Sequence, residues 1–286
     1  MRRCVYLTTV VLLLFGGVSA QEKEPETAAD YMKRGVERAR KGELEAAIAD
    51  YDRAILLSPG DARTYNYRGA ARGRRGDLGG ALADFNLAIT LDPNNAGAYY
   101  NRGLTRVRKG DEDGALADYN TAISLNPNEV AAYNGRAVIR SRRGDQAGAI
   151  ADYDKILAVN PNAAEIYTNR GIARNALGDF DGALADYGKA IELRPDYAYA
   201  YNNRGNTYGK RGDDDAAIAD YSKAISLVPN FAAAYANRGL AELSKGMDAA
   251  AEEDFKKALE ISGSLKTMIE TESNKIRQKR KSTQQP

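Results

Sequence analysis

A period of 34 residues without insertions dominates this sequence and restricts its fold more than any other feature. A proline lies two residues before the end of six of the units, and a glycine lies near the middle of all seven. The prolines are Pro59, Pro93, Pro127, Pro161, Pro195 and Pro229, and the glycines are Gly42, Gly76, Gly110, Gly144, Gly178, Gly212 and Gly246. Units of this length cannot bury their apolar surfaces alone, so they stack on their neighbours into a solenoid. The sequence therefore predicts one array, with units 28–61, 62–95, 96–129, 130–163, 164–197, 198–231 and 232–265.

Each unit is predicted to form two helices joined by a tight turn. In the third unit, the first helix begins near Tyr99 and ends at Gly110, because glycine can adopt the left-handed conformation that ends a helix. Asp111 follows and can cap the second helix by accepting backbone N–H bonds. The segment ALADYNTAISL then places apolar residues at helical spacing before Pro127 stops the helix.

Six positions of each unit carry the pattern of the tetratricopeptide repeat (TPR) family, which this chain resembles. When the first residue of each unit is position 1, these are positions 4, 8, 20, 24, 27 and 32. In the third unit they are occupied by Tyr99, Gly103, Ala115, Tyr119, Ala122 and Pro127. The resemblance implies an all-α fold, an α-solenoid in which seven helix-turn-helix units form a right-handed superhelix. It also implies a concave face lined by the first helix of each unit, and we expect a capping helix at the C-terminal end.

The chain departs from the family pattern at a few packing positions. Tyrosine replaces the usual tryptophan at position 4 of all seven units. The fourth unit has Ala137 and Ile156 where the family has glycine and alanine, and the seventh has Met247 after its turn and Gly263 for proline. None of these residues conflicts with the fold, although the fourth unit is expected to bend the array differently.

Arginine at position 7 is unexpected, because this position lies on the inward stripe of a helix, where an unpaired charge would cost several kcal/mol. An aspartate at position 23 recurs with the same period. The arginines are Arg34, Arg68, Arg102, Arg136, Arg170, Arg204 and Arg238, and the aspartates are Asp50, Asp84, Asp118, Asp152, Asp186, Asp220 and Asp254. We predict a ladder of structural ion pairs, because a guanidinium can engage a carboxylate with two parallel hydrogen bonds. The alternative is that these arginines bind anionic ligands.

Asparagines recur on the face that lines the groove of this family. They occupy position 6 or position 5 of several units, with a tyrosine at position 5 of the third. These residues are Asn101, Asn169, Asn203, Asn237, Asn66, Asn134, Asn202 and Tyr100. An amide offers both a donor and an acceptor, so it can hold the main chain of an extended peptide of any sequence. The alternative is ordinary polarity of a helix surface.

Basic residues at position 13 are a second candidate feature of the groove. The clearest cases are Arg74, Arg108, Arg142 and Lys210. They could form a basic edge that favours acidic partners, or simply place favourable charge at the C-terminal end of each first helix. The set of residues with which some family members clamp a C-terminal carboxylate does not occur in any three successive units.

Both ends of the chain differ from the array. Residues 1–20 resemble a cleavable export signal, with Arg2 and Arg3 before an uncharged run and small residues up to Ala20. A retained membrane anchor is the alternative, but the run is shorter than the roughly 20 residues that a span needs. Residues 21–27 are expected to be a short linker. Residues 266–286 are expected to form a capping helix and a basic tail that is disordered from Ser282 onward, with weak contact to an anionic surface as an alternative role.

Composition argues against enzymatic chemistry. The chain has no histidine, and its only cysteine, Cys4, lies in the expected signal. Most nucleophilic, metal and nucleotide sites therefore lack their usual residues, so we expect no cofactor and no metal. The net charge of +2 does not indicate a nucleic-acid partner. We expect a non-enzymatic scaffold that binds an extended peptide or protein in its concave groove, in the bacterial periplasm. The alternatives are a self-assembling structural solenoid and a binder of an anionic partner through the basic edge and tail.

Overall fold

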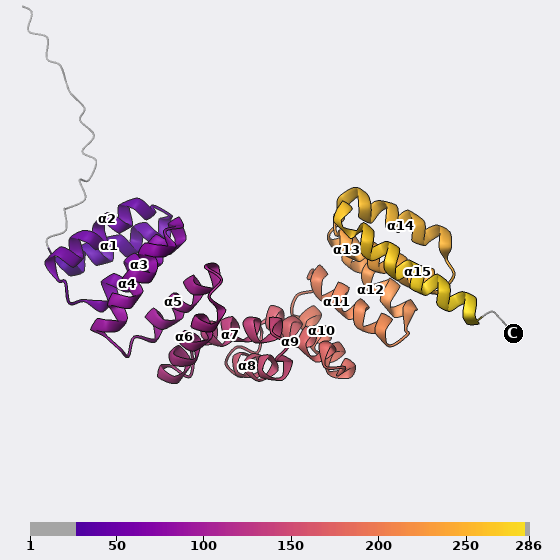
Figure 1. Ribbon diagram of the computed structural model, residues 1–286, viewed down its shortest axis with the longest axis horizontal. Helices are drawn as coiled ribbons and strands as arrows, with labels where there is room; N and C mark the ends of the chain where they lie inside the picture. Colours follow the sequence, from indigo (N-terminus) through magenta and orange to yellow (C-terminus); the bar gives the residue numbers. More distant parts are fainter. Residues whose placement is uncertain (1–26, 284–286) are drawn as a thin grey trace, which may run out of the picture.

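The computed structural model describes residues 27–283, and these form fifteen α-helices and one short 3-10 turn (Figure 1). The expected export signal, residues 1–20, lies outside the described residues, as do most of the expected linker and residues 284–286. The helices are α1 (Ala28–Lys41), α2 (Leu44–Leu57), α3 (Ala62–Arg75), α4 (Leu78–Leu91), α5 (Ala96–Arg108), α6 (Glu112–Leu125), α7 (Val130–Arg142), α8 (Gln146–Val159), α9 (Ala164–Ala176), α10 (Phe180–Leu193), α11 (Ala198–Lys210), α12 (Asp214–Leu227), α13 (Ala232–Ser244), α14 (Asp248–Ile261) and α15 (Lys266–Thr283).

The first fourteen helices form seven pairs, and each pair begins at the first residue of a predicted unit. The pairs stack side by side into a curved array (Figure 1). Through the middle of the array, α5, α7, α9 and α11 lie toward the hollow of the arc, and α6, α8, α10 and α12 lie on its outer side. The predicted all-α solenoid of seven helical pairs with a C-terminal helix is therefore confirmed.

A glycine at the turn ends the first helix of every pair. All seven turn glycines have positive φ, between 82° and 100°. Residues with a Cβ rarely adopt this conformation, whereas glycine does so without penalty. The aspartate after the turn usually caps the second helix, as Asp111 does by accepting a hydrogen bond from the Gly114 N–H at 2.9 Å. Glu43 and Met247 make no side-chain cap at the equivalent place.

The core of each repeat is an aromatic ring against a residue with little or no side chain. Tyr119 is 1% exposed, and a Cβ built on Gly103 would lie 2.8 Å from its Cε1 atom. The flanking alanines Ala115 and Ala122 are fully buried. Small residues at these positions therefore let the two helices of a repeat approach closely.

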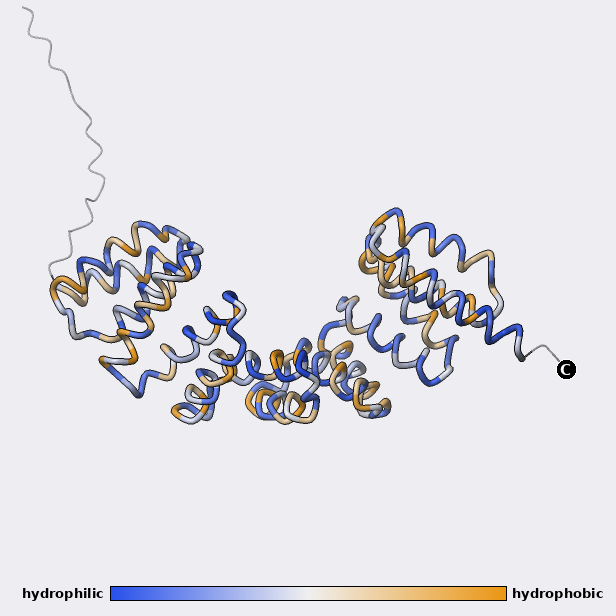
Figure 2. Tube along the Cα trace, viewed as in Figure 1, coloured by the Kyte–Doolittle hydropathy of each residue, from blue (hydrophilic) through white to orange (hydrophobic). Residues whose placement is uncertain are grey.

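Hydrophobic and hydrophilic residues alternate along the helices (Figure 2). Because each helix buries one face against its neighbours, this pattern is the one expected for a solenoid with a thin, continuous core. Within residues 27–283, no helix is both long and apolar enough to cross a membrane.

Both ends of the described array are closed by polar surface. Glu37 is exposed at position 10 of the first repeat. The six later repeats bury their residue at this position: Ala71, Thr105, Ile139, Ala173, Thr207 and Ala241. At the other end, α15 packs on α13 and α14 and buries Ile269. Another repeat could not stack on either end without burying charge or displacing α15.

The basic C-terminal segment is more ordered than the sequence suggested. The helix α15 continues to Thr283, so Ser282 and Thr283, which we expected to be disordered, are helical. Arg277 pairs with Glu252 at 2.5 Å, which fastens this helix to the last repeat. The charge spacing did not reveal this role, because the partners lie in another helix.

Candidate peptide-binding groove

Each arginine at position 7 pairs with the aspartate 16 residues later in the same repeat. In the second repeat, Arg68 donates from Nε to Asp84 Oδ2 at 3.0 Å and from Nη2 to Asp84 Oδ1 at 2.6 Å. Asp84 is 1% exposed, so the pair joins the two helices of the repeat through a buried contact. The other pairs are Arg34–Asp50, Arg102–Asp118, Arg136–Asp152, Arg170–Asp186, Arg204–Asp220 and Arg238–Asp254.

A second arginine, at position 11, completes the site in five repeats and was missed by the sequence analysis. Arg106 donates from Nη1 to Asp118 Oδ2 at 2.8 Å while Arg102 holds the other oxygen. The equivalent residues are Arg38, Arg72, Arg140 and Arg174. In the sixth and seventh repeats the position is Tyr208 and Glu242. Its recurrence every 34 residues was the available signal.

The position-7 arginines also join successive repeats. Arg68 Nη1 contacts Asp52 of the preceding repeat at 2.6 Å, and Arg102 Nη1 contacts Asn86 at 2.8 Å. Arg136, Arg170 and Arg238 make the same contact with Asn120, Asp154 and Ser222. Because protein acceptors occupy their N–H groups, these arginines hold the array together and are not arranged to bind anions.

The seventh repeat contains a buried carboxylate without a full set of partners. Glu242 replaces the second arginine and is 8% exposed, and its Oε2 atom has no hydrogen bond. Burial raises the pKa of Glu242, and the nearby Asp254 carboxylate raises it further. This repeat is therefore electrostatically weaker than the first five.

The asparagines of the candidate groove pair with one another across repeats. Asn101 donates to Asn66 Oδ1 at 2.9 Å, and Asn237 donates to Asn202 Oδ1 at 3.1 Å. Asn202 is buried, so its amide belongs to the packing between repeats. Asn203 donates to the carbonyl of Tyr199 in its own helix at 2.9 Å. The structure therefore leaves only part of this amide series open to a ligand.

Two position-5 residues, Asn134 and Tyr100, also lie in the packing between helices. Packing also explains why the fourth repeat has Gly135 at position 6, where the asparagine series is interrupted. The Oδ1 atom of Asn134 is buried without a hydrogen-bond partner. Tyr100 lies against Tyr119, with 6.1 Å between ring centroids. A Cβ on Gly135, at position 6, would lie 2.7 Å from the Cζ atom of Tyr119. The fourth repeat therefore has glycine where its neighbours carry asparagine.

The basic residues at position 13 contact the preceding repeat. Arg108 Nη1 donates to the carbonyl of Gly73 at 2.6 Å, and Arg74 Nη1 donates in the same way to Ala39 at 2.8 Å. Arg142 pairs with Glu112 at 3.0 Å, and Lys210 donates to Asn175 Oδ1 at 3.0 Å. The expected basic edge thus bonds each of these first helices to the preceding repeat, through a backbone carbonyl, the Glu112 carboxylate or the Asn175 amide.

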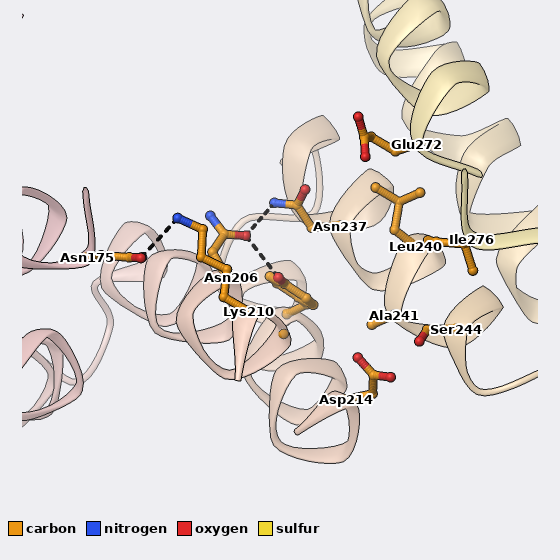
Figure 3. Close-up of a pocket in the computed structure, with 12 residues that line it drawn as sticks. Asn175, Asn206, Lys210, Asp214, Asn237, Leu240, Ala241, Ser244, Glu272 and Ile276 are labelled. Carbon is orange, nitrogen blue, oxygen red and sulfur yellow. Dashed lines mark hydrogen bonds between the residues drawn. The ribbon is translucent and has the colours of Figure 1, made fainter. Parts of the chain in front are cut away.

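Three clefts open between successive first helices, and each contains predicted groove residues. The largest, about 590 Å³, lies where α11 and α13 meet α15 and includes Lys210 and Asn237 (Figure 3). A second, about 190 Å³, is lined by Arg74, Asn101 and Arg108. A third, about 180 Å³, is lined by Arg142 and Asn169. Within residues 27–283, no group of three or more metal-ligating side chains comes together.

Exposed apolar residues at position 9 were missed by the sequence analysis. Leu104, Val138 and Ile172 are 45%, 39% and 42% exposed in three consecutive first helices, and all three line the smaller clefts. Tyr199, at position 2 of the sixth repeat, is 59% exposed, and the centroid of its ring lies 5.0 Å from that of Phe231. Apolar residues at these positions resemble packing residues in the sequence, and only their exposure distinguishes them.

Comparison with family models identifies repeats along most of the chain. Models described as "TPR repeat" match residues 35–76, 74–110 and 173–212. Models described as "Tetratricopeptide repeat" match residues 100–164, 198–231 and 232–264. A search of curated protein sequences gave no match.

Solved structures share the same architecture. The chain is 33% identical to MamA, with a TM-score of 0.53, over 58% of this chain and 96% of MamA. A tetratricopeptide repeat protein from Parabacteroides merdae matches at 24% identity and a TM-score of 0.61, over 87% of this chain and 98% of its own. YrrB, described as a TPR protein with an unusual peptide-binding site, matches at 24% identity and a TM-score of 0.59, over 64% of this chain and 95% of YrrB.

Proposed function

Because the chain belongs to the tetratricopeptide repeat family, we propose that it is a non-enzymatic scaffold whose concave face binds an extended segment of another protein. The observation that carries this proposal is the row of exposed apolar residues Leu104, Val138 and Ile172. The odd-numbered helices that bear them line the hollow of the arc (Figure 1). Groups of exposed apolar residues with polar residues around them are typical of protein-interaction sites.

The surroundings of this row suit a peptide main chain. Asn169 lines one cleft beside Val138 and Ile172, and Asn101 lines another beside Leu104. Amide side chains can supply a donor or an acceptor to a backbone unit, while the apolar residues take side chains of the bound segment. That YrrB is described as having a peptide-binding site is consistent with this function.

The two alternative functions are less well supported. A self-assembling solenoid needs complementary ends, yet Glu37 is exposed at one end and α15 covers the other. Binding of an anionic partner through the basic edge would compete with the contacts of Arg74 and Arg108 to backbone carbonyls. A tail that contacts an anionic surface would likewise compete with the Arg277–Glu252 pair.

We also propose that residues 1–20 are an export signal and that the mature chain works in the bacterial periplasm. The support is the basic start, the uncharged run and the small residues before Gln21. Mass spectrometry of the protein purified from its native cells should give a chain that begins at Gln21. A cytoplasmic pool of full-length chain with Cys4 intact would contradict export.

The groove is tested by affinity capture from an envelope fraction with residues 21–286 as bait. Changing Leu104, Val138 and Ile172 together to serine should remove the bound partner, because the apolar contacts with it are lost. The fold should be retained, because these side chains are exposed in the free protein. The matched control changes three exposed apolar residues of second helices, Leu56, Leu87 and Val159, to serine. If the control loses the partner and the groove variant keeps it, the binding surface lies on the second helices.

A further inference from the structure

We propose that the cleft where α11 and α13 meet α15 binds an arginine side chain of the partner. This inference rests on the proposed function and names a chemical feature of the bound segment. The cleft has a volume of about 590 Å³, within the range of ligand pockets, and is the largest of the three described above (Figure 3). It lies at a place where the array lacks one of its own basic side chains.

Elsewhere in the array, a basic residue at the end of one first helix bonds the repeat before it. Arg108 donates to the carbonyl at position 12 of the preceding first helix, and Arg142 pairs with the carboxylate at position 17. Arg280 of α15 makes both kinds of contact in the seventh repeat. It donates to the carbonyl of Leu243 at 3.0 Å and pairs with Asp248. One guanidinium can therefore join a helix-terminal carbonyl and a carboxylate in this geometry.

The sixth repeat offers the same two acceptor positions without a basic residue to meet them. Gly209 stands at position 12 and Asp214 at position 17, and both line the cleft. The residue that would carry the arginine, at position 13 of the seventh repeat, is Ser244. Within residues 27–283, the Asp214 carboxylate has no hydrogen bond or ion pair. The cleft therefore opens where an arginine side chain lies in other repeats.

The other interruption of the basic series shows that such a gap can be closed from within. Ala176 occupies position 13 of the fifth repeat, where it cannot reach the fourth. Gln146, at position 17 of the fourth repeat, donates from Nε2 to the carbonyl of Ser141 at 3.0 Å. It thereby bonds the carbonyl that an arginine bonds elsewhere. The gap at Ser244 has the Asp214 carboxylate in this place, and the neighbouring basic residue, Lys245, pairs with Asp215 instead.

The remaining walls of the cleft fit a long side chain with a cationic end. Leu240 and Ile276 provide apolar contact for a methylene stem, and Glu272, which accepts a hydrogen bond from Lys275, adds negative charge to the rim. Figure 3 shows the Lys210 ammonium turned toward Asn175, on the side away from Glu272. An arginine fits better than a lysine, because its planar fork can reach a carboxylate and a carbonyl together.

The test uses an array of nine-residue peptides in which one arginine occupies each position in turn. Each peptide is compared with versions that carry lysine, citrulline or glutamate at the same place. We expect the wild-type chain to retain arginine peptides and to bind the citrulline versions about tenfold more weakly or worse. Asp214→Asn should reduce the arginine preference without preventing the binding of other peptides.

The variant Ser244→Arg provides a second, independent readout. Its new side chain should occupy the cleft, abolish the arginine preference and raise the melting temperature by about 2–4 °C. Ser244→Met is the matched control and should not raise the melting temperature in this way.

Peptides retained without an arginine preference, or a preference unchanged by Ser244→Arg, would overturn this inference and leave the proposed function standing. Retention of no peptide at all would overturn both.

Discussion

Asp220 depends on a single arginine, Arg204, which donates to its two oxygens at 2.7 and 2.8 Å. Asp118, the equivalent residue three repeats earlier, is held by both Arg102 and Arg106. The difference arises because the sixth repeat has Tyr208 at the position of the second arginine. The same ladder therefore contains strong and weak steps whose energies can be compared.

Replacing Arg204 by leucine should destabilise the protein more than replacing Arg102. Arg204→Leu leaves a nearly buried carboxylate with no cation, which costs on the order of 3 kcal/mol. Arg102→Leu leaves Arg106 in place, so we expect a loss of about 1–2 kcal/mol. Denaturant unfolding of the two variants and the wild type checks this order. Equal losses would mean that the second arginine contributes nothing.

Replacing Gly188 by aspartate should stabilise the junction between the fifth and sixth repeats. Gly188 occupies position 25, where Asp52 and Asp154 accept a hydrogen bond from the following arginine. An aspartate would offer Arg204 this missing acceptor and would also remove a glycine from the interior of α10. We expect about 1 kcal/mol in total. Gly188→Ala is the control for helix propensity, and if it stabilises as much as Gly188→Asp, the added pair is without effect.

Replacing Glu242 by arginine should stabilise the seventh repeat at neutral pH. The new side chain would reach Asp254 as Arg106 reaches Asp118, and a buried carboxylate would be removed. The gain should be about 1–2 kcal/mol at pH 7. Because the pKa of Glu242 is raised in the folded state, its favourable contribution exists below about pH 4.3 and is lost as the pH rises.

The gain from Glu242→Arg should therefore shrink as the pH falls toward 4. Unfolding free energies at pH 7 and pH 4 measure the difference. A gain that grows toward pH 4 would contradict the assignment of Glu242 as a destabilising group.

Alkaline pH should unfold the array through its buried tyrosines. Burial raises the pKa of Tyr119 to about 12, above the value of about 10 for an exposed tyrosine. The unfolded chain therefore loses this proton first, and the stability associated with Tyr119 is lost between about pH 10 and pH 12. The melting temperature of Tyr119→Phe should fall less steeply than that of the wild type over this interval, and parallel slopes would exclude the effect.

Periodicity predicted the fold and the position-7 ladder because both depend on contacts that every repeat makes. The second arginine recurs too, but its partner could be assigned only once the two helices were placed. The groove was harder to predict, because Asn101 and Asn237 each donate to an asparagine of the preceding repeat, 35 residues earlier. Sequence alone does not show whether such an amide faces a neighbour or a ligand. The exposure of Leu104 likewise depends on how neighbouring residues pack around it in the folded array.

The central claim is that residues on the first helices bind the partner while the periodic ladder only supports them. Hydroxyl-radical footprinting of the free protein and of its complex with the captured partner tests this claim directly. Leu104 and Leu87 are matched reporters, because they are 45% and 46% exposed and lie on a first and a second helix. Binding should slow the oxidation of Leu104, Val138 and Ile172 and leave Leu87 unchanged. Protection of Leu87 with no change at Leu104 would contradict the account.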